Sequence, residues 1–137
     1  MNIAALKIQL IKDEGLRLRP YTDTVGKITI GVGRNLEDVG ITSVEADFLL
    51  TNDIQKVQAQ LNSTMSWWAG LSDNRQLVIA NMAFNMGVPR LLGFKRMWEA
   101  LEVHNYVHAA DEMMDSKWAG QVGTRAIRLA KIMKGGQ

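Results

Sequence analysis

The hydrophobic pattern of this chain changes its period near Gly15, and this change restricts the folds that the chain can adopt. Apolar residues first recur at helical spacing, which predicts a helix over 3–13. Glycine is common just past a helix end, so this helix should stop near Glu14. Pro20 then disfavours helix, and residues 21–33 alternate as the strands of a hairpin do.

The length of the hairpin loop decides which residues share a face. A two-residue loop would place Asp23 opposite Ile28, on the apolar face. A three-residue loop ending in Gly26 would place Asp23 on the polar face, with Thr29. Glycine suits the left-handed third position of the longer loop, so we predict the three-residue form.

The rest of the chain reads as helices. Thr42 and Glu45 form a capping box, and the helix that they begin should reach about residue 61. Further helices are predicted at 73–86 (capped by Ser72 and closed by Gly87), 94–103, 106–116 and 124–134. The fold class is therefore α+β. We expect one domain over 1–137, with a small hairpin lobe at about 14–42, a long connecting helix at about 43–61, and a larger all-helical lobe at about 62–137 that includes the helix at 3–13.

Composition excludes several classes of protein. A net charge of +2, with 47% hydrophobic and 22% charged residues, indicates a soluble globular chain and argues against nucleic-acid binding. There is no cysteine, and His104 and His108 read as an exposed polar pair, so no metal site is expected. No stretch is long and apolar enough to span a membrane, and we find no secretory signal. A monomer made in the cytoplasm is the expectation.

One segment combines residues that suit acid–base chemistry. Glu14 ends the first helix, while Asp23 and Thr29 share the polar face of the hairpin, where Gly31 and Gly33 leave room for a ligand. Each alone has a simpler interpretation, as an exposed acid, a turn-forming aspartate and a strand-favouring threonine. Together they resemble the two carboxylates that flank a glycosidic bond during its hydrolysis.

The residue identities in this segment are more specific than the spacing alone. The sequence DEGLRLRPYTDTVGKITIGVGRN, residues 13–35, closely resembles the catalytic segment of the T-even phage lysozymes. The resemblance continues, in the order of that family, in NMAFNMG (81–87) and SKWAGQVGTRAIRL (116–129). It implies a lysozyme-like fold and a muramidase (endolysin) that lyses host cells. Such an enzyme cleaves the β-1,4 bond between N-acetylmuramic acid and N-acetylglucosamine of bacterial peptidoglycan, with inversion and without metal or cofactor.

The resemblance assigns roles to the three residues. Glu14 would be the general acid, Asp23 would support the reaction centre, and Thr29 would position the attacking water. An inverting mechanism requires the carboxyl groups of Glu14 and Asp23 to lie about 6.5–9.5 Å apart, which leaves room for that water.

The resemblance also implies residues around the reaction centre. Asn35, Phe84 and Asn85 would bind substrate, although core packing is an equally good interpretation of Phe84. Arg125 would pair with the acid. The end of the helix dipole favours the protonated form of Glu14, whereas Arg125 favours the charged form, and both outcomes remain open.

Some positions depart from the family pattern. The family has an acid where this chain has Val25, a glutamine in place of Asn85, and a histidine in place of Arg34. The stretch from Gly33 to the capping box is also much shorter. We therefore expect a trimmed small lobe and altered subsites, with the three reacting residues retained.

The sequence is also compatible with two other functions and with one further partner. A lytic transglycosylase, which yields anhydromuramyl products, and a non-catalytic wall-binding module are the alternatives. The basic row Arg125, Arg128 and Lys131 could touch an anionic outer membrane, although a solvated basic face is the favoured interpretation. Without an export signal, a lysis enzyme would need a membrane pore to reach the periplasm.

Overall fold

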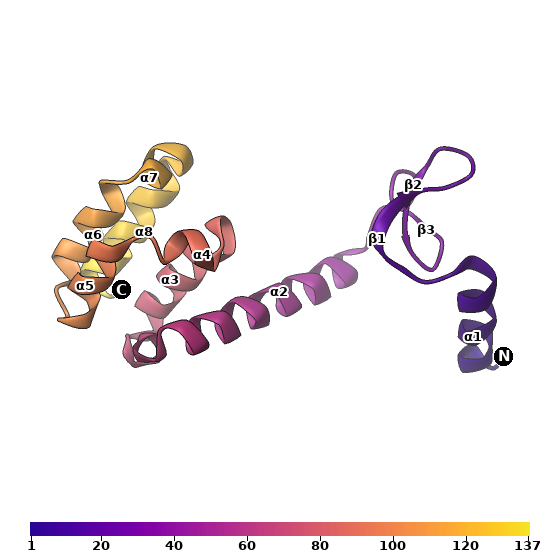
Figure 1. Ribbon diagram of the computed structural model, residues 1–137, viewed down its shortest axis with the longest axis horizontal. Helices are drawn as coiled ribbons and strands as arrows, with labels where there is room; N and C mark the ends of the chain where they lie inside the picture. The colour runs from indigo at the N-terminus through magenta and orange to yellow at the C-terminus, as the bar shows by residue number, and fades with distance from the viewer. The chain divides into compact units, whose positions relative to one another are not determined.

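The computed structural model describes residues 1–137 as two compact units, Met1–Leu49 and Leu50–Gln137. The first unit holds a helix and a three-stranded sheet, and the second consists of helices (Figure 1). The fold class is α+β, as predicted. The boundary falls within the long helix α2 (Ser43–Thr64), so this helix contributes residues to both units. That the helix at 3–13 belongs with the helical lobe stays a prediction.

The first helix ends where the sequence indicates. Helix α1 spans Ile3–Glu14, and the side chain of Asn2 caps it by accepting a hydrogen bond from the Ala5 N–H. Gly15 follows with a φ of 79°, a value that favours glycine, and its N–H still bonds to the carbonyl of Ile11. Glu14 is therefore the last residue of the helix, and the chain turns away from the helix axis immediately after it.

The sheet is larger than the predicted hairpin. It is antiparallel in the order β1-β2-β3, with strands Arg17–Thr22, Ile28–Gly31 and Arg34–Asn35. The first strand begins before Pro20, because an edge strand does not need the N–H that proline lacks. The prediction of strand up to residue 33 is wrong. Gly31 and Gly33 have φ values of 70° and 69°, which interrupt the extended chain and turn it back into β3.

The hairpin register follows the three-residue loop. Tyr21 pairs with Thr29, and the Asp23 N–H donates to the carbonyl of Lys27 at 2.9 Å. Gly26 has a φ of 84°, the left-handed value that the third loop position requires. The prediction that Asp23 and Thr29 lie on one face of the hairpin is confirmed.

The start of α2 confirms the capping box. The Glu45 carboxylate accepts from the Thr42 N–H at 3.0 Å, and the Thr42 hydroxyl accepts from the Glu45 N–H at 3.2 Å. The same Glu45 oxygen accepts from Arg34 at 2.9 Å, and Arg34 also donates to the Gly40 carbonyl at 3.2 Å. The arginine that replaces the family histidine thus ties β3 to the start of α2, which continues to Thr64 rather than 61.

Glu45→Gln should lower the melting temperature at neutral pH. The hydrogen bond from Arg34, with those from Thr42, lowers the pKa of the Glu45 carboxyl to about 2. A lowered pKa stabilises the fold above the ordinary value of 4.5, and this stabilisation is lost as the pH falls toward 2. Melting curves between pH 2 and 7 should therefore converge for the variant and the wild type at the acid end. A difference that is constant across this range would contradict the assignment, and Glu102→Gln, on an exposed surface, is the control.

The second unit contains the predicted helices and three short ones that the sequence did not reveal. The predicted helices correspond to α3 (Asp73–Met86), α5 (Lys95–Glu102), α6 (Tyr106–Met114) and α8 (Thr124–Gly135). The additional elements are the 3-10 helix η1 (Ser66–Gly70), α4 (Val88–Leu91) and α7 (Lys117–Val122). Helix α6 packs on α5 and α8, and α3 packs on α8 (Figure 1).

The hydrophobic core lies in this helical unit. Side chains from α3, α5, α6 and α8 fill it, with Trp118 and several methionines among the fully buried residues. The buried methionines are Met82, Met97, Met113 and Met133, which confirms their interpretation as core filler. His104 lies in the turn between α5 and α6, so it does not share a helix face with His108. None of the helices combines the length and apolar character that crossing a bilayer requires.

Candidate active site

Glu14, Asp23 and Thr29 line one pocket of the first unit, with a volume of about 360 Å³. They come from three places in the chain: the end of α1, the hairpin loop and strand β2. The other lining residues are Arg17, Tyr21, Thr22, Thr24 and Gly33. The pocket is therefore lined by two carboxylates, one cation and several hydroxyl-bearing residues, Thr29 among them.

The Asp23 side chain supports the hairpin loop with one of its oxygens. Oδ1 accepts from the Lys27 N–H at 2.8 Å and from the Val25 N–H at 3.0 Å. These bonds fix the carboxylate relative to the backbone of the loop. They use Oδ1 alone, so Oδ2 can accept a hydrogen bond from a bound molecule.

The Thr29 hydroxyl is held in one orientation. Thr29 is the single polar residue that is buried, with 3% of its surface exposed, and its Oγ1 donates to the carbonyl of Lys27 at 3.0 Å. Because the hydroxyl proton is used in this bond, the lone pairs of Oγ1 remain as acceptors. A water molecule in the pocket would therefore donate to Thr29 and keep its own lone pairs for other partners.

The cation of the pocket, Arg17, was not predicted from the sequence. The Arg17 guanidinium lies 4.4 Å from the centre of the Tyr21 ring, an arrangement typical of cation–π contacts. Both residues belong to β1, whose first residues were not predicted as strand. The register places Arg17 opposite Gly31 and Tyr21 opposite Thr29, so an earlier strand start would have revealed them.

Gly31 does not lie on the floor of this pocket, and that expectation is corrected. It lines a separate apolar hollow of the same unit, beside Ile30 and Val32. Its positive φ ends the alternation of β2, so residues beyond it do not continue on the face that Thr29 occupies. Gly33 does line the pocket, in the turn between β2 and β3.

Asn35 lies outside the lining of this pocket. Its side chain bonds to Asp38 twice, accepting from the backbone N–H at 2.9 Å and donating to the carboxylate at 3.0 Å. Both polar groups of the amide are thereby used to close the loop after β3. A substrate contact for Asn35 stays a prediction.

Three predicted residues lie in the helical unit. Phe84 is 45% exposed, so it is not part of the core, and it lines an apolar groove together with Arg125. Arg125 donates to the Asn81 side chain through Nε at 3.0 Å and Nη2 at 2.7 Å. Asn85 accepts from the Trp118 indole N–H at 2.9 Å, which leaves its NH₂ group for other partners.

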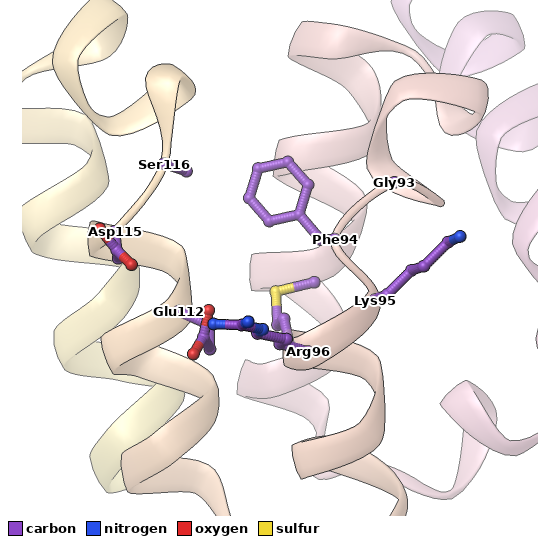
Figure 2. A pocket seen from close by; sticks show the side chains of 8 residues that line it. Gly93, Phe94, Lys95, Arg96, Glu112, Asp115 and Ser116 are labelled. Atoms are coloured by element: carbon purple, nitrogen blue, oxygen red, sulfur yellow. The ribbon is translucent and has the colours of Figure 1, made fainter.

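The helical unit also contains a polar pocket, and none of the residues predicted to act in the site lines it. Figure 2 shows Arg96 and Glu112 directed toward each other across it, while Lys95 points away. The hydroxyl of Ser116 is committed to the cap of α7, since it donates to the Met113 carbonyl and accepts from the Ala119 N–H. We assign no step of a reaction to this pocket.

Two of the three residues in the basic row of α8 face solvent. Arg128 and Lys131 are exposed, whereas Leu129 and Met133 on the opposite side are buried in the core. This division is typical of an ordinary amphipathic helix at the surface of a helical bundle. Contact with an outer membrane stays a prediction.

A helix that ends in an acid, followed by a hairpin that adds a carboxylate and a buried hydroxyl, is the arrangement that the sequence predicts for a lysozyme-type site. Comparison with known proteins points to the same class of enzyme. The family described as phage lysozyme matches residues 11–131. The chain is 31% identical to "Probable T4-type lysozyme 1" of Dictyostelium discoideum, over 98% of this chain and 96% of that protein. It is 31% identical to the endolysin of Salmonella phage P22, over 82% of this chain and 81% of that protein.

A further similarity concerns part of a larger protein. The pre-baseplate central spike protein Gp5 of Enterobacteria phage T4 is 31% identical over 90% of this chain, which corresponds to 26% of that protein. The family match covers most of the chain. The chain therefore belongs to the phage lysozyme family, and it is a glycoside hydrolase of the lysozyme type that acts on peptidoglycan.

Proposed function

We propose that this lysozyme cleaves the β-1,4 bond between N-acetylmuramic acid and N-acetylglucosamine, with inversion at the anomeric carbon. The observation that carries the proposal is the common pocket of Glu14, Asp23 and Thr29 in a chain of this family. An acid and a second carboxylate are the groups that hydrolysis by inversion needs, and the Thr29 hydroxyl adds an acceptor for the attacking water.

In the first part of the reaction, Glu14 protonates the glycosidic oxygen as the bond to the anomeric carbon breaks. Positive charge then develops on the sugar ring, and the Asp23 carboxylate stabilises it. The hydrogen bonds to Asp23 Oδ1 support this role, because they hold the carboxylate in place before the charge appears. No rearrangement of the loop is required during the reaction.

In the second part, a water molecule attacks the anomeric carbon from the face opposite the leaving group. Thr29 accepts one hydrogen bond from this water, and Asp23 Oδ2 accepts the other and takes the proton. The hydrogen bond from Thr29 to the Lys27 carbonyl supports this assignment, since it leaves Oγ1 as an acceptor. Glu14 and Asp23 exchange protons with solvent before the next cycle.

The remaining residues are assigned to substrate binding and to the acid. We propose that Phe84 packs against a sugar ring, that the NH₂ group of Asn85 binds a polar substituent, and that Asn35 contributes at the exit of the hairpin. That Arg125 pairs with the acid is proposed from the family resemblance, and the bonds of Arg125 to Asn81 leave its Nη1 unused. The apolar groove that Phe84 lines supports its role in substrate binding.

The biological setting is proposed from the relatives. Two of the similar proteins are named endolysins, which supports host cell lysis as the role of this chain. We propose that it acts as a monomer on the periplasmic cell wall, which it reaches from the cytoplasm through a membrane pore.

The products distinguish this proposal from a lytic transglycosylase. Mass spectrometry of digested peptidoglycan should give reducing muramyl ends that carry one added water, because a bound water rather than the muramyl 6-hydroxyl attacks. Proton NMR of the first product should show the α anomer. Anhydromuramyl ends would favour the transglycosylase, a β anomer would refute inversion, and wall binding without any soluble product would favour a binding module.

A further inference from the structure

We propose that Gly33 is a positioning residue that sets the place of the Glu14 carboxyl group. This inference rests on the proposed role of Glu14 as the acid. Gly33 lies in the turn between β2 and β3, and it lines the pocket together with Glu14. No partner in a hydrogen bond or ion pair fixes Glu14 within its unit, so its position depends on what it packs against.

A side chain at position 33 would press on Glu14. A Cβ atom on Gly33 would lie 3.3 Å from Glu14 Oε2, 3.5 Å from Cδ and 3.6 Å from Cγ. The shortest of these distances is below an ordinary van der Waals contact, so the carboxyl group would have to move. The Glu14 side chain is flexible, and a shift of a few tenths of an ångström is the easiest response.

The turn that carries Gly33 is itself anchored. Arg34, the next residue, pairs with Ile30 across the sheet and binds the Glu45 carboxylate and the Gly40 carbonyl. The turn therefore cannot easily retreat from an added methyl group. A small displacement of the acid matters, because a general acid must stay within hydrogen-bond reach of the oxygen that it protonates.

Gly31 provides a matched control two residues away. Its φ of 70° equals that of Gly33 within one degree, so alanine meets the same left-handed φ at both positions. A Cβ atom on Gly31, however, would meet no atom within 4 Å, and this residue faces the separate apolar hollow. The pair of alanine variants therefore separates backbone strain from pressure on Glu14.

The first experiment compares Gly33→Ala with Gly31→Ala on soluble peptidoglycan fragments. We expect kcat to fall on the order of tenfold or more in Gly33→Ala, with KM little changed, because a misplaced acid slows the chemical step. Gly31→Ala should keep kcat within about twofold once the folded fraction is accounted for. Equal losses in the two variants, or an unchanged kcat in Gly33→Ala, would overturn the proposal.

The second experiment tests the contact without any activity. Gly33→Ala should lower the melting temperature more than Gly31→Ala does, and the excess should vanish in a Glu14→Ala background, where the crowded atoms are absent. An excess that persists there would show that position 33 does not act through Glu14 and would overturn the proposal. If the wild type released no product from peptidoglycan, the proposed function would fail, while these melting curves would still decide the contact.

Discussion

Glu14→Gln is expected to abolish the clearing of outer-membrane-permeabilised Gram-negative cells. Glutamine keeps the shape of the side chain and removes the proton that the leaving oxygen must receive. Loss of a general acid costs on the order of 10²–10⁴ in rate. The initial rate of turbidity loss at equal protein concentration measures the effect. Because Glu14 is exposed, the variant should melt close to the wild type.

The control for this experiment is Glu102→Gln, which removes an exposed carboxylate of the helical unit. It should clear cells at the wild-type rate. If Glu14→Gln cleared cells equally well, the acid would lie elsewhere and the proposed mechanism would be wrong. If neither the wild type nor the variants cleared cells, the binding-module alternative would be preferred.

Asp23→Asn is expected to reduce the rate on the order of 10²–10³ without disturbing the fold, since it removes a charge that opposes the developing cation. The asparagine carbonyl oxygen can still accept from the Val25 and Lys27 N–H groups, so the loop keeps its conformation. Circular dichroism and melting temperature should match the wild type. Rates on soluble peptidoglycan fragments measure the loss.

Two further variants separate the effect of the Asp23 charge on the rate from its effect on stability. Asp23→Ala removes the acceptor as well as the charge, and each lost hydrogen bond should cost about 0.5–1.5 kcal/mol of stability. Asp47→Asn neutralises an exposed carboxylate of α2 in the same unit and should leave the rate unchanged. An Asp23→Asn variant that retained most of its activity would limit Asp23 to the structural role that its backbone bonds already give it.

Local chemistry made the first part of the fold predictable. Gly15 ends α1, Gly26 selects the three-residue loop, and Thr42 with Glu45 begins α2, each through backbone geometry within a few residues. The strand β3 was not predictable in this way. It is two residues long, and it exists because Gly31 and Gly33 fold the chain back onto β2.

The candidate site was likewise predictable only in part. Alternation along the hairpin placed Asp23 and Thr29 on one face, whereas the resemblance to the lysozyme family was needed to group Glu14 with them. Spacing could not show that the Asn35 side chain is hydrogen-bonded to Asp38, or that Arg17 lines the pocket. These facts depend on loop closure and on where an edge strand begins, which no periodicity encodes.

The sequence by itself determined the fold class, the order of the elements, the register of the hairpin and the three residues assigned to the reaction. Caps, turns and alternation set the fold class, the element order and the register, and the resemblance to a known family singled out the three residues. Only the tertiary structure decided that the Thr29 hydroxyl donates a hydrogen bond to the Lys27 carbonyl and that the Glu14 carboxyl rests against Gly33. Both depend on atoms that meet across a turn or between two elements, and such distances are fixed by packing in three dimensions rather than by position along the chain.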